Sequence, residues 1–431
     1  MQFSSLGIRP GLERTSRLLS LLGSPQKRFR AIHVLGTNGK GSTAATLEAI
    51  LKRAGVRTAL YTSPHLVSLQ ERLRIDGRPL PIESWNAAFD AMRSAVEHDE
   101  VLGSSKPTFF ENLTAMAFSM ITDENVGIAV IEAGMGGRYD ATSTCDPIAT
   151  VITPIGMDHM EYLGSTIEAI ASEKFAAVRG GVPAFYAADD ATLTDQFLAT
   201  CDRVGAQPFL LDRIALPRDV RCDLDGTSFS LSNISNFHTP LIGVHQAENA
   251  AHAVVVLQTL LSKKILPPGC SIDEKILRDG LRDTNWPGRF ERFRCDDGLP
   301  DIVVDGAHNA HGMRALVETL SAIEGEGKGS AASTVGAVVF AVMKDKDIAP
   351  VLEQLKTLRR PLYCTEPPNP RAMPHAELAE IALSLGVDVA GSWEDPFDAL
   401  HAARMASNPS GFVLCCGSLF LAGHIRARYA E

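Results

Sequence analysis

The chain has 431 residues, of which 45% are apolar, 21% charged and 6% aromatic, and its formal net charge is −10. This is the composition of a globular protein, and at roughly 100–200 residues per domain the length predicts two or three domains. The negative charge argues against general nucleic-acid binding, which requires a basic surface. No window approaches the ~20 consecutive apolar residues of a membrane span, and the N-terminus lacks a secretory-signal pattern.

The first part of the chain alternates strand-like and helix-like segments, which predicts a mostly parallel sheet covered on both faces. The expected strands are 31–35, 57–62, 126–134, 148–154 and 182–188. Between the first two, Ala44, Leu47, Leu51 and Ala54 lie on one face of a helix that Gly55 would end.

A different pattern follows this sheet. Residues 218–242 contain short alternating runs around Asp225-Gly226, a hairpin signal, and 245–284 is rich in helical spacing. Pro287 and Gly288 then break the pattern within NWPGRFERF (285–293), which indicates an interdomain linker.

Beyond the linker, a second and smaller doubly wound domain is predicted. Strands are expected at 301–305, 335–342, 361–365, 386–390 and 411–416, each followed by a helix, and GEGKGSAAST (325–334) is predicted to be a flexible loop. The fold class is therefore α/β, with an N-terminal doubly wound, P-loop ATPase-like domain and a smaller, Rossmann-like C-terminal domain. The boundaries we predict are 1–288, a linker at 289–298, and 299–431.

The eight cysteines are scattered along the chain and form no C-x-x-C pair. Structural zinc and a disulfide framework are therefore not expected. We interpret most of these cysteines as buried apolar side chains of a reduced, cytoplasmic protein.

The stretch AIHVLGTNGKGST (31–43) resembles a phosphate-binding loop with an altered spelling. The usual pattern, G-x-x-x-x-G-K-[ST], would place glycine at Val34 and a hydroxyl residue at Gly41. A strand that runs into Gly36, Gly39 and Lys40 and then into a helix is nevertheless the context for phosphate binding, since backbone N–H groups, the helix N-terminus and the lysine all attract an anion. The simpler alternative is a glycine turn with a surface lysine.

Polar side chains follow three further strands at the same predicted edge of the sheet. Ser63 follows the second strand, Glu132 ends the third, and Asp158 and His159 follow the fourth. Serine and carboxylate oxygens suit Mg²⁺, whereas a histidine ligand is less usual for Mg²⁺ and compatible with Mn²⁺. Without a ligand, Ser63 would be a turn residue, Glu132 an N-cap partner and His159 a loop histidine.

Seven motifs occur together and in order: GTNGKGS, SPHL, E-x-G-x-G-G-R-x-D-A-T, D-H-x-x-x-L-G, S-E-K, PGRF and DGAHN. This combination resembles the folylpolyglutamate synthase family, relatives of the Mur peptidoglycan ligases. The similarity extends from Gly36 to CGSLFLAG (416–423). The family spells its loop G-T-N-G-K-G-[ST], which accounts for Val34 and Gly41.

The resemblance implies roles for individual residues. The ATP-binding residues would be Asn38, Gly39, Lys40, Gly41, Ser42, Asn249, Arg289, Asp305 and His308, with Asn309 nearby. Ser63, Glu132 and His159 would hold two Mg²⁺ ions, with Mn²⁺ as an alternative and K⁺ as a further cation. The catalytic residues would be Lys40, Lys174 and His159, and Lys174 would be carbamylated to N6-carboxylysine. Without the resemblance, Lys174 would be a solvated helix lysine and Arg289 a salt-bridge partner at a hinge.

The resemblance also implies a pterin pocket. Its residues would be Thr108, Phe109, Phe110, Glu111, Tyr139, Asp140 and Ala141. The alternative is that TFF (108–110) only begins a helix and buries its phenylalanines. Three positions depart from the family: Tyr139 replaces leucine, Ser143 follows DAT in place of asparagine, and Ala310 replaces proline.

The implied function is an ATP-dependent acid–amino-acid ligase of folate biosynthesis. It would add L-glutamate to tetrahydrofolate and its polyglutamates and to dihydropteroate, through an acyl phosphate and without a protein nucleophile, for which the sequence has no G-x-S-x-G signature. The alternatives are a monofunctional folylpolyglutamate synthase, another Mur-type amide ligase, and a P-loop NTPase module. We expect a monomer with neither a nucleic-acid nor a membrane partner.

Overall fold

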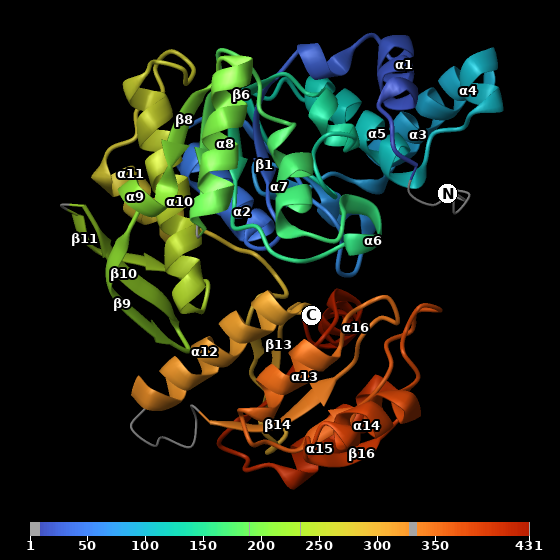
Figure 1. Ribbon diagram of the computed structural model, residues 1–431, viewed down its shortest axis with the longest axis vertical. Coiled ribbons are helices and arrows are strands. Elements are labelled where there is room, and N and C mark those ends of the chain that lie inside the picture. Colours follow the sequence, from blue (N-terminus) through green and yellow to red (C-terminus); the bar gives the residue numbers. More distant parts are fainter. Residues whose placement is uncertain (1–8, 189, 233, 327–333, 431) are drawn as a thin grey trace. The chain divides into compact units, whose positions relative to one another are not determined.

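The computed structural model describes residues 9–188, 190–232, 234–326 and 334–430 (Figure 1). The chain divides into two compact units. The first comprises Met1–Pro217, Leu231–Ile234 and Glu248–Thr284; the second comprises Arg218–Ser230, Ser235–Ala247 and Asn285–Glu431.

The first unit is built on an eight-stranded sheet with the order β4-β3-β2-β5-β1-β6-β7-β8. Its strands are β1 (Arg30–Leu35), β2 (Thr58–Tyr61), β3 (Leu73–Ile75), β4 (Arg78–Pro79), β5 (Ile128–Glu132), β6 (Pro147–Ile152), β7 (Pro183–Tyr186) and β8 (Gln207–Leu210). All neighbours are parallel except at the edge formed by β3 and β4, which pair antiparallel. The carboxyl ends of β1, β2, β5 and β6 therefore meet at one edge.

Helices precede, connect and follow the strands of this sheet. They are α1 (Glu13–Leu21), α2 (Lys40–Arg53), α3 (Ile82–Glu97), α4 (Glu100–Ser104), α5 (Phe109–Asp123), α6 (Met160–Leu163), α7 (Ile167–Phe175), α8 (Ala191–Val204), α9 (Leu211–Ile214), α10 (Val244–Ser262) and α11 (Glu274–Arg282), with 3₁₀ turns η1 (Pro25–Lys27), η2 (Leu69–Arg72) and η3 (Ala141–Thr144). Helices α1, α3 and α5 pack with β1, β2 and β5 in one apolar core, and α7 and α8 pack with β6 and β7 in another.

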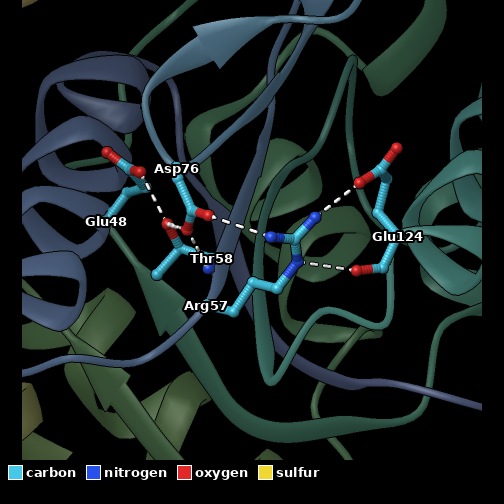
Figure 2. A network of polar contacts seen from close by, with 5 residues as sticks. All are labelled: Glu48, Arg57, Thr58, Asp76 and Glu124. Carbon is cyan, nitrogen blue, oxygen red and sulfur yellow. Dashed lines mark hydrogen bonds and ion pairs between the residues drawn. The ribbon is translucent and has the colours of Figure 1, made fainter.

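A polar network fixes the far end of the phosphate-loop helix (Figure 2). Glu48 of α2 accepts a 2.7 Å hydrogen bond from Thr58 Oγ1 of β2, and the Thr58 backbone N–H donates to Asp76 Oδ1 at 2.9 Å. Arg57 donates to Asp76 and to both the backbone and the side chain of Glu124 at the end of α5. Burial raises the pKa of the Glu48 carboxyl, while the Thr58 hydrogen bond opposes that shift. The network thus fixes the positions of α2, β2 and the end of α5 relative to one another.

The second unit contains a six-stranded sheet with the order β12-β13-β17-β14-β15-β16. The strands are β12 (Glu291–Phe293), β13 (Asp301–Val304), β14 (Val335–Phe340), β15 (Leu362–Cys364), β16 (Val389–Ser392) and β17 (Phe412–Cys416); only β12 runs antiparallel. The helices are α12 (Ala310–Glu326), α13 (Ala349–Lys356), α14 (His375–Ser384), α15 (Pro396–Ala406) and α16 (Leu419–Tyr429). A separate sheet joins β9 (Pro217–Asp223), β10 (Gly226–Leu231) and β11 (Ile234–Thr239).

The predicted fold class is confirmed: both units are α/β with mostly parallel sheets. The hairpin at Asp225-Gly226 is confirmed as the β9–β10 turn, and each predicted strand matches an observed one within a few residues. The cysteines form no disulfide; six are buried, and Cys270 and Cys295 are half-buried. Within the ranges described above, no helix is long and apolar enough to cross a membrane.

The predicted domain boundaries remain a proposal about how the sequence is organised. The compact units divide the chain differently, because 218–230 and 235–247 belong to the second unit, and the predicted linker at 289–298 contains strand β12. The predicted loop at 325–334 lies mostly outside the described residues.

Candidate functional site

The phosphate-loop region lies between β1 and α2. Gly36 has a φ of +136°, and a Cβ there would lie 1.9 Å from Thr153 Oγ1, so no other residue fits beside β6. Gly39 caps α2 in the left-handed conformation with a φ of +83°. The loop is anchored by Thr37, whose backbone N–H donates to Pro154 O at 3.0 Å and whose hydroxyl exchanges hydrogen bonds with Gly156. A strand, a tight turn and a helix N-terminus therefore follow one another along the chain, which is the arrangement that phosphate binding requires.

The polar groups of this loop lie beside α10. Lys40 is the first residue of α2, and its ammonium donates to Thr37 O at 3.1 Å. Asn249 of α10 lies against the loop: its Oδ1 accepts a 3.4 Å hydrogen bond from Thr43 Oγ1, and a Cβ on Gly39 would lie 2.5 Å from the same oxygen. The structure therefore brings Asn249 against the loop, and its role as a nucleotide contact stays a prediction. Asn38, Gly41 and Ser42 occupy the turn and first residues of α2, where Ser42 is buried.

Lys174, near the end of α7, is a buried lysine and not a solvated one. It is 4% exposed, and its Nζ donates to Gly36 O at 2.9 Å, across a separation of 138 residues. Burial, together with the smaller effect of the nearby positive charge of Lys40, lowers the pKa of Lys174 to about 7, against the opposing effect of Asp158 and Asp140. Near neutral pH, a large fraction of this side chain is therefore the neutral amine.

Ser63 and Glu132, two of the predicted metal ligands, lie together. The Ser63 backbone N–H donates to Glu132 Oε2 at 3.2 Å, and Glu132 is only 4% exposed at the end of β5. His159, in contrast, is exposed and has a left-handed φ of 53°; its backbone N–H donates to Asp158 Oδ1.

These donors can be compared with what a metal ion would need. In the described ranges, no three His, Cys, Asp or Glu side chains are grouped to hold a metal. The Ser63–Glu132 pair offers hard oxygen donors, and Mg²⁺ characteristically completes such a set with water and phosphate oxygens. The pair therefore fits Mg²⁺.

Thr108 and Glu111 begin α5 and are occupied by hydrogen bonds within the protein. They form a capping box, in which Glu111 Oε2 accepts from the Thr108 N–H at 2.6 Å and Thr108 Oγ1 accepts from the Glu111 N–H. Arg14 of α1 adds two hydrogen bonds to the Glu111 carboxylate, at 3.2 and 2.9 Å. Both side chains therefore hold the start of α5 in place.

The aromatic residues of the predicted pterin pocket differ in exposure. Phe109 and Phe110 are half-buried at the start of α5 and pack against the core of the first unit. A Cβ at Gly134 would lie 2.6 Å from Phe110 Cζ, so the ring closes over the glycine-rich turn after β5. Tyr139, from the same turn region, is 53% exposed. TFF does begin a helix, but the two rings remain partly accessible.

Asp140 is the centre of a buried hydrogen-bond chain. Its Oδ1 accepts from the Thr142 N–H at 3.0 Å and from Thr142 Oγ1 at 2.5 Å, while its Oδ2 accepts from the Met135 N–H at 2.7 Å. Thr142 Oγ1 also lies 2.9 Å from His33 Nε2. Because the threonine proton goes to Asp140, His33 must donate to Thr142. Burial lowers the pKa of His33 to about 3, which keeps the ring neutral, and raises the pKa of Asp140. Ala141 begins η3 and is buried.

The remaining predicted nucleotide residues belong to the second unit. Asp305 follows β13 and is buried; its two carboxylate oxygens accept from the Phe290 and Ala307 N–H groups at 2.8 and 2.7 Å. Burial raises the pKa of Asp305, opposed by the charge of Arg289. His308 Nδ1 lies 2.8 Å from Gly306 O, and Asn309 Oδ1 accepts from the Gly312 N–H near the start of α12. Arg289, Asp305 and His308 thus form one local group.

Sequence reasoning missed His33, Thr142 and Arg14. His33 had a usable signal, because it is the one polar residue within the strand-like run AIHVL (31–35). Arg14 had none, since its partner lies 97 residues away in the sequence.

Comparisons with known proteins agree with this geometry. Residues 34–257 match the Mur ligase middle domain, and residues 288–419 match the Mur ligase, glutamate ligase domain. The dihydrofolate synthase/folylpolyglutamate synthase of Bacillus subtilis is 34% identical, over 98% of this chain and 95% of that protein.

Two solved structures are similar along almost their whole length. Mycobacterium tuberculosis folylpolyglutamate synthase complexed with ADP has a TM-score of 0.89 and 31% identity, covering 99% of this chain and 96% of that one. Escherichia coli FolC in complex with DHPP and ADP has a TM-score of 0.81 and 29% identity, covering 99% and 94%.

The phosphate loop, the two α/β units and the two matched domains define a Mur-type ligase. The match over nearly the full length of both chains is more specific than that class. The chain belongs to the folylpolyglutamate synthase/dihydrofolate synthase family, which confirms the resemblance identified from its motifs.

Proposed function

We propose that this protein is an ATP-dependent ligase that adds L-glutamate both to dihydropteroate and to reduced folates, including tetrahydrofolate and its polyglutamates. The observation that carries the proposal is the glycine-rich loop after β1, where Lys40 donates to Thr37 O and the buried Lys174 donates to Gly36 O, in a chain of this family. Backbone N–H groups at a helix N-terminus and the half-buried Lys40 ammonium are suited to a polyphosphate.

In the first step, a carboxylate oxygen of the pteroyl substrate attacks the γ-phosphorus of ATP, and ADP leaves with the electrons of the broken P–O bond. The loop N–H groups from Asn38 to Ser42 and the Lys40 ammonium neutralise charge that develops on the transferred group. Asn249 holds the loop from α10. Arg289, Asp305 and His308 are proposed as the nucleotide contacts of the second unit.

In the second step, the amino nitrogen of L-glutamate attacks the acyl carbon, inorganic phosphate leaves, and the nitrogen loses a proton as the amide forms. No protein nucleophile is needed, because the phosphate already makes the carboxyl carbon reactive. An acyl phosphate hydrolyses in water, so binding of the substrates must exclude water from the site.

Ser63 and Glu132, and by family resemblance His159, are the residues that would hold Mg²⁺ when it is bound with ATP. The ion would neutralise phosphate charge. Two ions, Mn²⁺ as a substitute and K⁺ as a further cation remain expectations from the family.

Lys174 is proposed to be carbamylated. Only a neutral amine attacks CO₂, and the pKa of about 7 makes that form abundant at neutral pH. The neutral amine nitrogen would bond to the carbon of CO₂ and lose a proton, and the resulting carbamate anion would be attracted to the nearby Lys40 ammonium.

The pterin pocket is proposed to lie between the start of α5 and the turn after β5. Phe110 and Phe109 would supply an aromatic wall, and Asp140 a hydrogen-bond acceptor for a pterin ring. Thr108, Glu111 and Ala141 would shape this pocket, and Tyr139 would border it. We further propose a cytoplasmic monomer.

An omission assay tests this function. ADP release is measured with ATP, dihydropteroate and L-glutamate together and with each omitted, and again with tetrahydrofolate as the acceptor. We expect sustained ADP release only in the complete mixtures, with one amide product formed for each ADP; without L-glutamate, at most one ADP per enzyme should form. ATP hydrolysis at the same rate with and without the acceptor and L-glutamate would favour a P-loop NTPase instead. If the complete mixture forms product with tetrahydrofolate but not with dihydropteroate, the enzyme is the monofunctional folylpolyglutamate synthase.

A further inference from the structure

The loop that follows Ser63 is organised around one carboxylate. Glu71 Oε2 accepts a hydrogen bond from the Leu66 N–H at 2.8 Å, and its Oε1 accepts from the Val67 and Ser68 N–H groups at 3.0 and 2.9 Å. With Ser68 it also forms the capping box of η2. A loop fixed by its own side chain presents its neighbouring residues with little conformational freedom.

The residue that this loop presents is Arg72, the last residue of η2. Arg72 is only 7% exposed, and its backbone O accepts from the Thr62 N–H at 2.9 Å, which attaches the end of the loop to the sheet edge. Its guanidinium Nε–H donates to His65 Nδ1 at 2.9 Å, and its Cζ lies 5.6 Å from the centre of the Phe109 ring. The group is therefore held from two sides.

The outer end of the guanidinium is different. In the described part of the chain, the hydrogen bond recorded for Arg72 is the one from Nε; its Nη atoms, which carry four further donors, make no recorded hydrogen bond or ion pair. Burial lowers the pKa of the Arg72 guanidinium, while Tyr61 and Glu132 favour its charged form. An arginine stays charged when buried, so this cation lies close to Glu132 with its planar fork unused.

We propose that Arg72 is a carboxylate-binding residue of the substrate site, and that its Nη fork takes the carboxylate of the pteroyl acceptor before that carboxylate is phosphorylated. Phe109 borders the same group, so an aromatic acid can stack on the ring while one carboxylate oxygen accepts from the fork. The other oxygen stays free to attack. This inference rests on the proposed ligase function. The same chemistry would also suit a carboxylate of L-glutamate, and the experiment separates the two.

The experiment compares binding of dihydropteroate with binding of its decarboxylated analogue, by calorimetry on the full chain. The wild-type protein should bind the acid about 10- to 100-fold more tightly, the range for charged hydrogen bonds. In Arg72→Met that preference should fall to near one, and Arg72→Lys, which keeps the charge but not the fork, should retain part of it. Arg78→Met removes an exposed arginine of β4 and should leave the preference unchanged.

Each outcome has one meaning. A preserved acid preference in Arg72→Met with a tenfold rise in the KM for L-glutamate would assign the fork to glutamate, and would still support a carboxylate site. If neither changes while ADP affinity and circular dichroism match the wild type, the proposal is wrong. Should Arg72→Met not fold, Arg72→Lys decides: a partial loss of the acid preference supports the proposal, and an unchanged preference with an unchanged KM for L-glutamate contradicts it. Wild-type protein that binds ADP but no dihydropteroate would overturn the proposed function, and this inference with it.

Discussion

The phosphate loop and the pterin pocket lie at the same sheet edge and use their polar side chains in opposite ways. At the loop, the Lys40 ammonium has three donors, and within the described residues it makes one hydrogen bond, to the Thr37 carbonyl. In the pocket, the Asp140 carboxylate accepts from Thr142 twice and from Met135, and Glu111 accepts from Thr108 and Arg14. The loop keeps its charges for a ligand, whereas the pocket uses its charges to hold its own shape.

Residues that match a family's binding motif can therefore have different roles: some contact the ligand, and others hold the shape of the site. Substitution of Lys40 should change activity and leave stability nearly unchanged, because its side chain is only half-buried. Substitutions in the pocket should change both, because a buried acceptor network is lost together with the pocket.

The largest effect is expected at Lys40. Lys40→Ala should lower kcat by about 10³-fold, since charge on the transferred phosphoryl group loses a cation, while the free energy of unfolding changes by less than ~0.5 kcal/mol. Steady-state kinetics and urea unfolding measure the two. Near-normal turnover would remove the phosphate loop from the active site.

The metal ligands come next. Glu132→Gln and His159→Ala should each weaken the apparent Mg²⁺ affinity by about 10- to 100-fold, measured by titrating activity with Mg²⁺. If Glu132→Gln titrates like the wild type, the metal is held elsewhere. If His159→Ala titrates like the wild type and Glu132→Gln does not, Ser63 and Glu132 hold the metal without His159.

The pocket residues should separate the two activities. Phe110→Ala and Asp140→Ala should reduce glutamate addition to dihydropteroate more than addition to tetrahydrofolate, because the smaller acceptor depends more on its pterin contacts. Asp140→Ala should also destabilise the fold by about 1–3 kcal/mol, as three donors lose a buried partner. Equal losses in both reactions would instead place these residues in machinery common to the two.

Lys174 gives a pH dependence of stability. In CO₂-free buffer, its pKa is about 7 in the folded protein and 10.5 in the unfolded chain, so the unfolded state binds more protons between those values. The free energy of unfolding should therefore rise as pH increases from about 7 to 10.5, by less than about 1.4 kcal/mol per pH unit. Lys174→Met should lack this rise. An identical slope in that variant would mean that Lys174 is charged in the fold.

The smallest expected effect tests the buried chain from His33 to Asp140. Thr142→Val removes the hydroxyl at nearly constant volume and should cost about 1–3 kcal/mol of unfolding free energy, whereas Thr142→Ser keeps the hydroxyl and most of the stability. Chemical denaturation compares them. Two variants of equal stability would show that the hydroxyl adds nothing.

Much of this organisation could be predicted from the sequence. Strands β1, β5 and β6 and helix α2 follow from local apolar spacing, and the order of glycines and Lys40 reveals the loop. The antiparallel edge strands β3 and β4 were not predicted, because two- and three-residue strands leave too short a pattern to detect. The contacts of Lys174 with Gly36 and of Arg14 with Glu111 join residues far apart in the chain, so only the fold reveals them.

The central claim is ligation through an acyl phosphate, and oxygen transfer tests it most directly. Dihydropteroate labelled with ¹⁸O in its carboxylate is incubated with ATP, L-glutamate and the enzyme, and the inorganic phosphate is analysed by mass spectrometry. The account predicts one ¹⁸O in each phosphate released, because the attacking carboxylate oxygen leaves with it. Unlabelled phosphate, formed together with the amide product, would contradict the account.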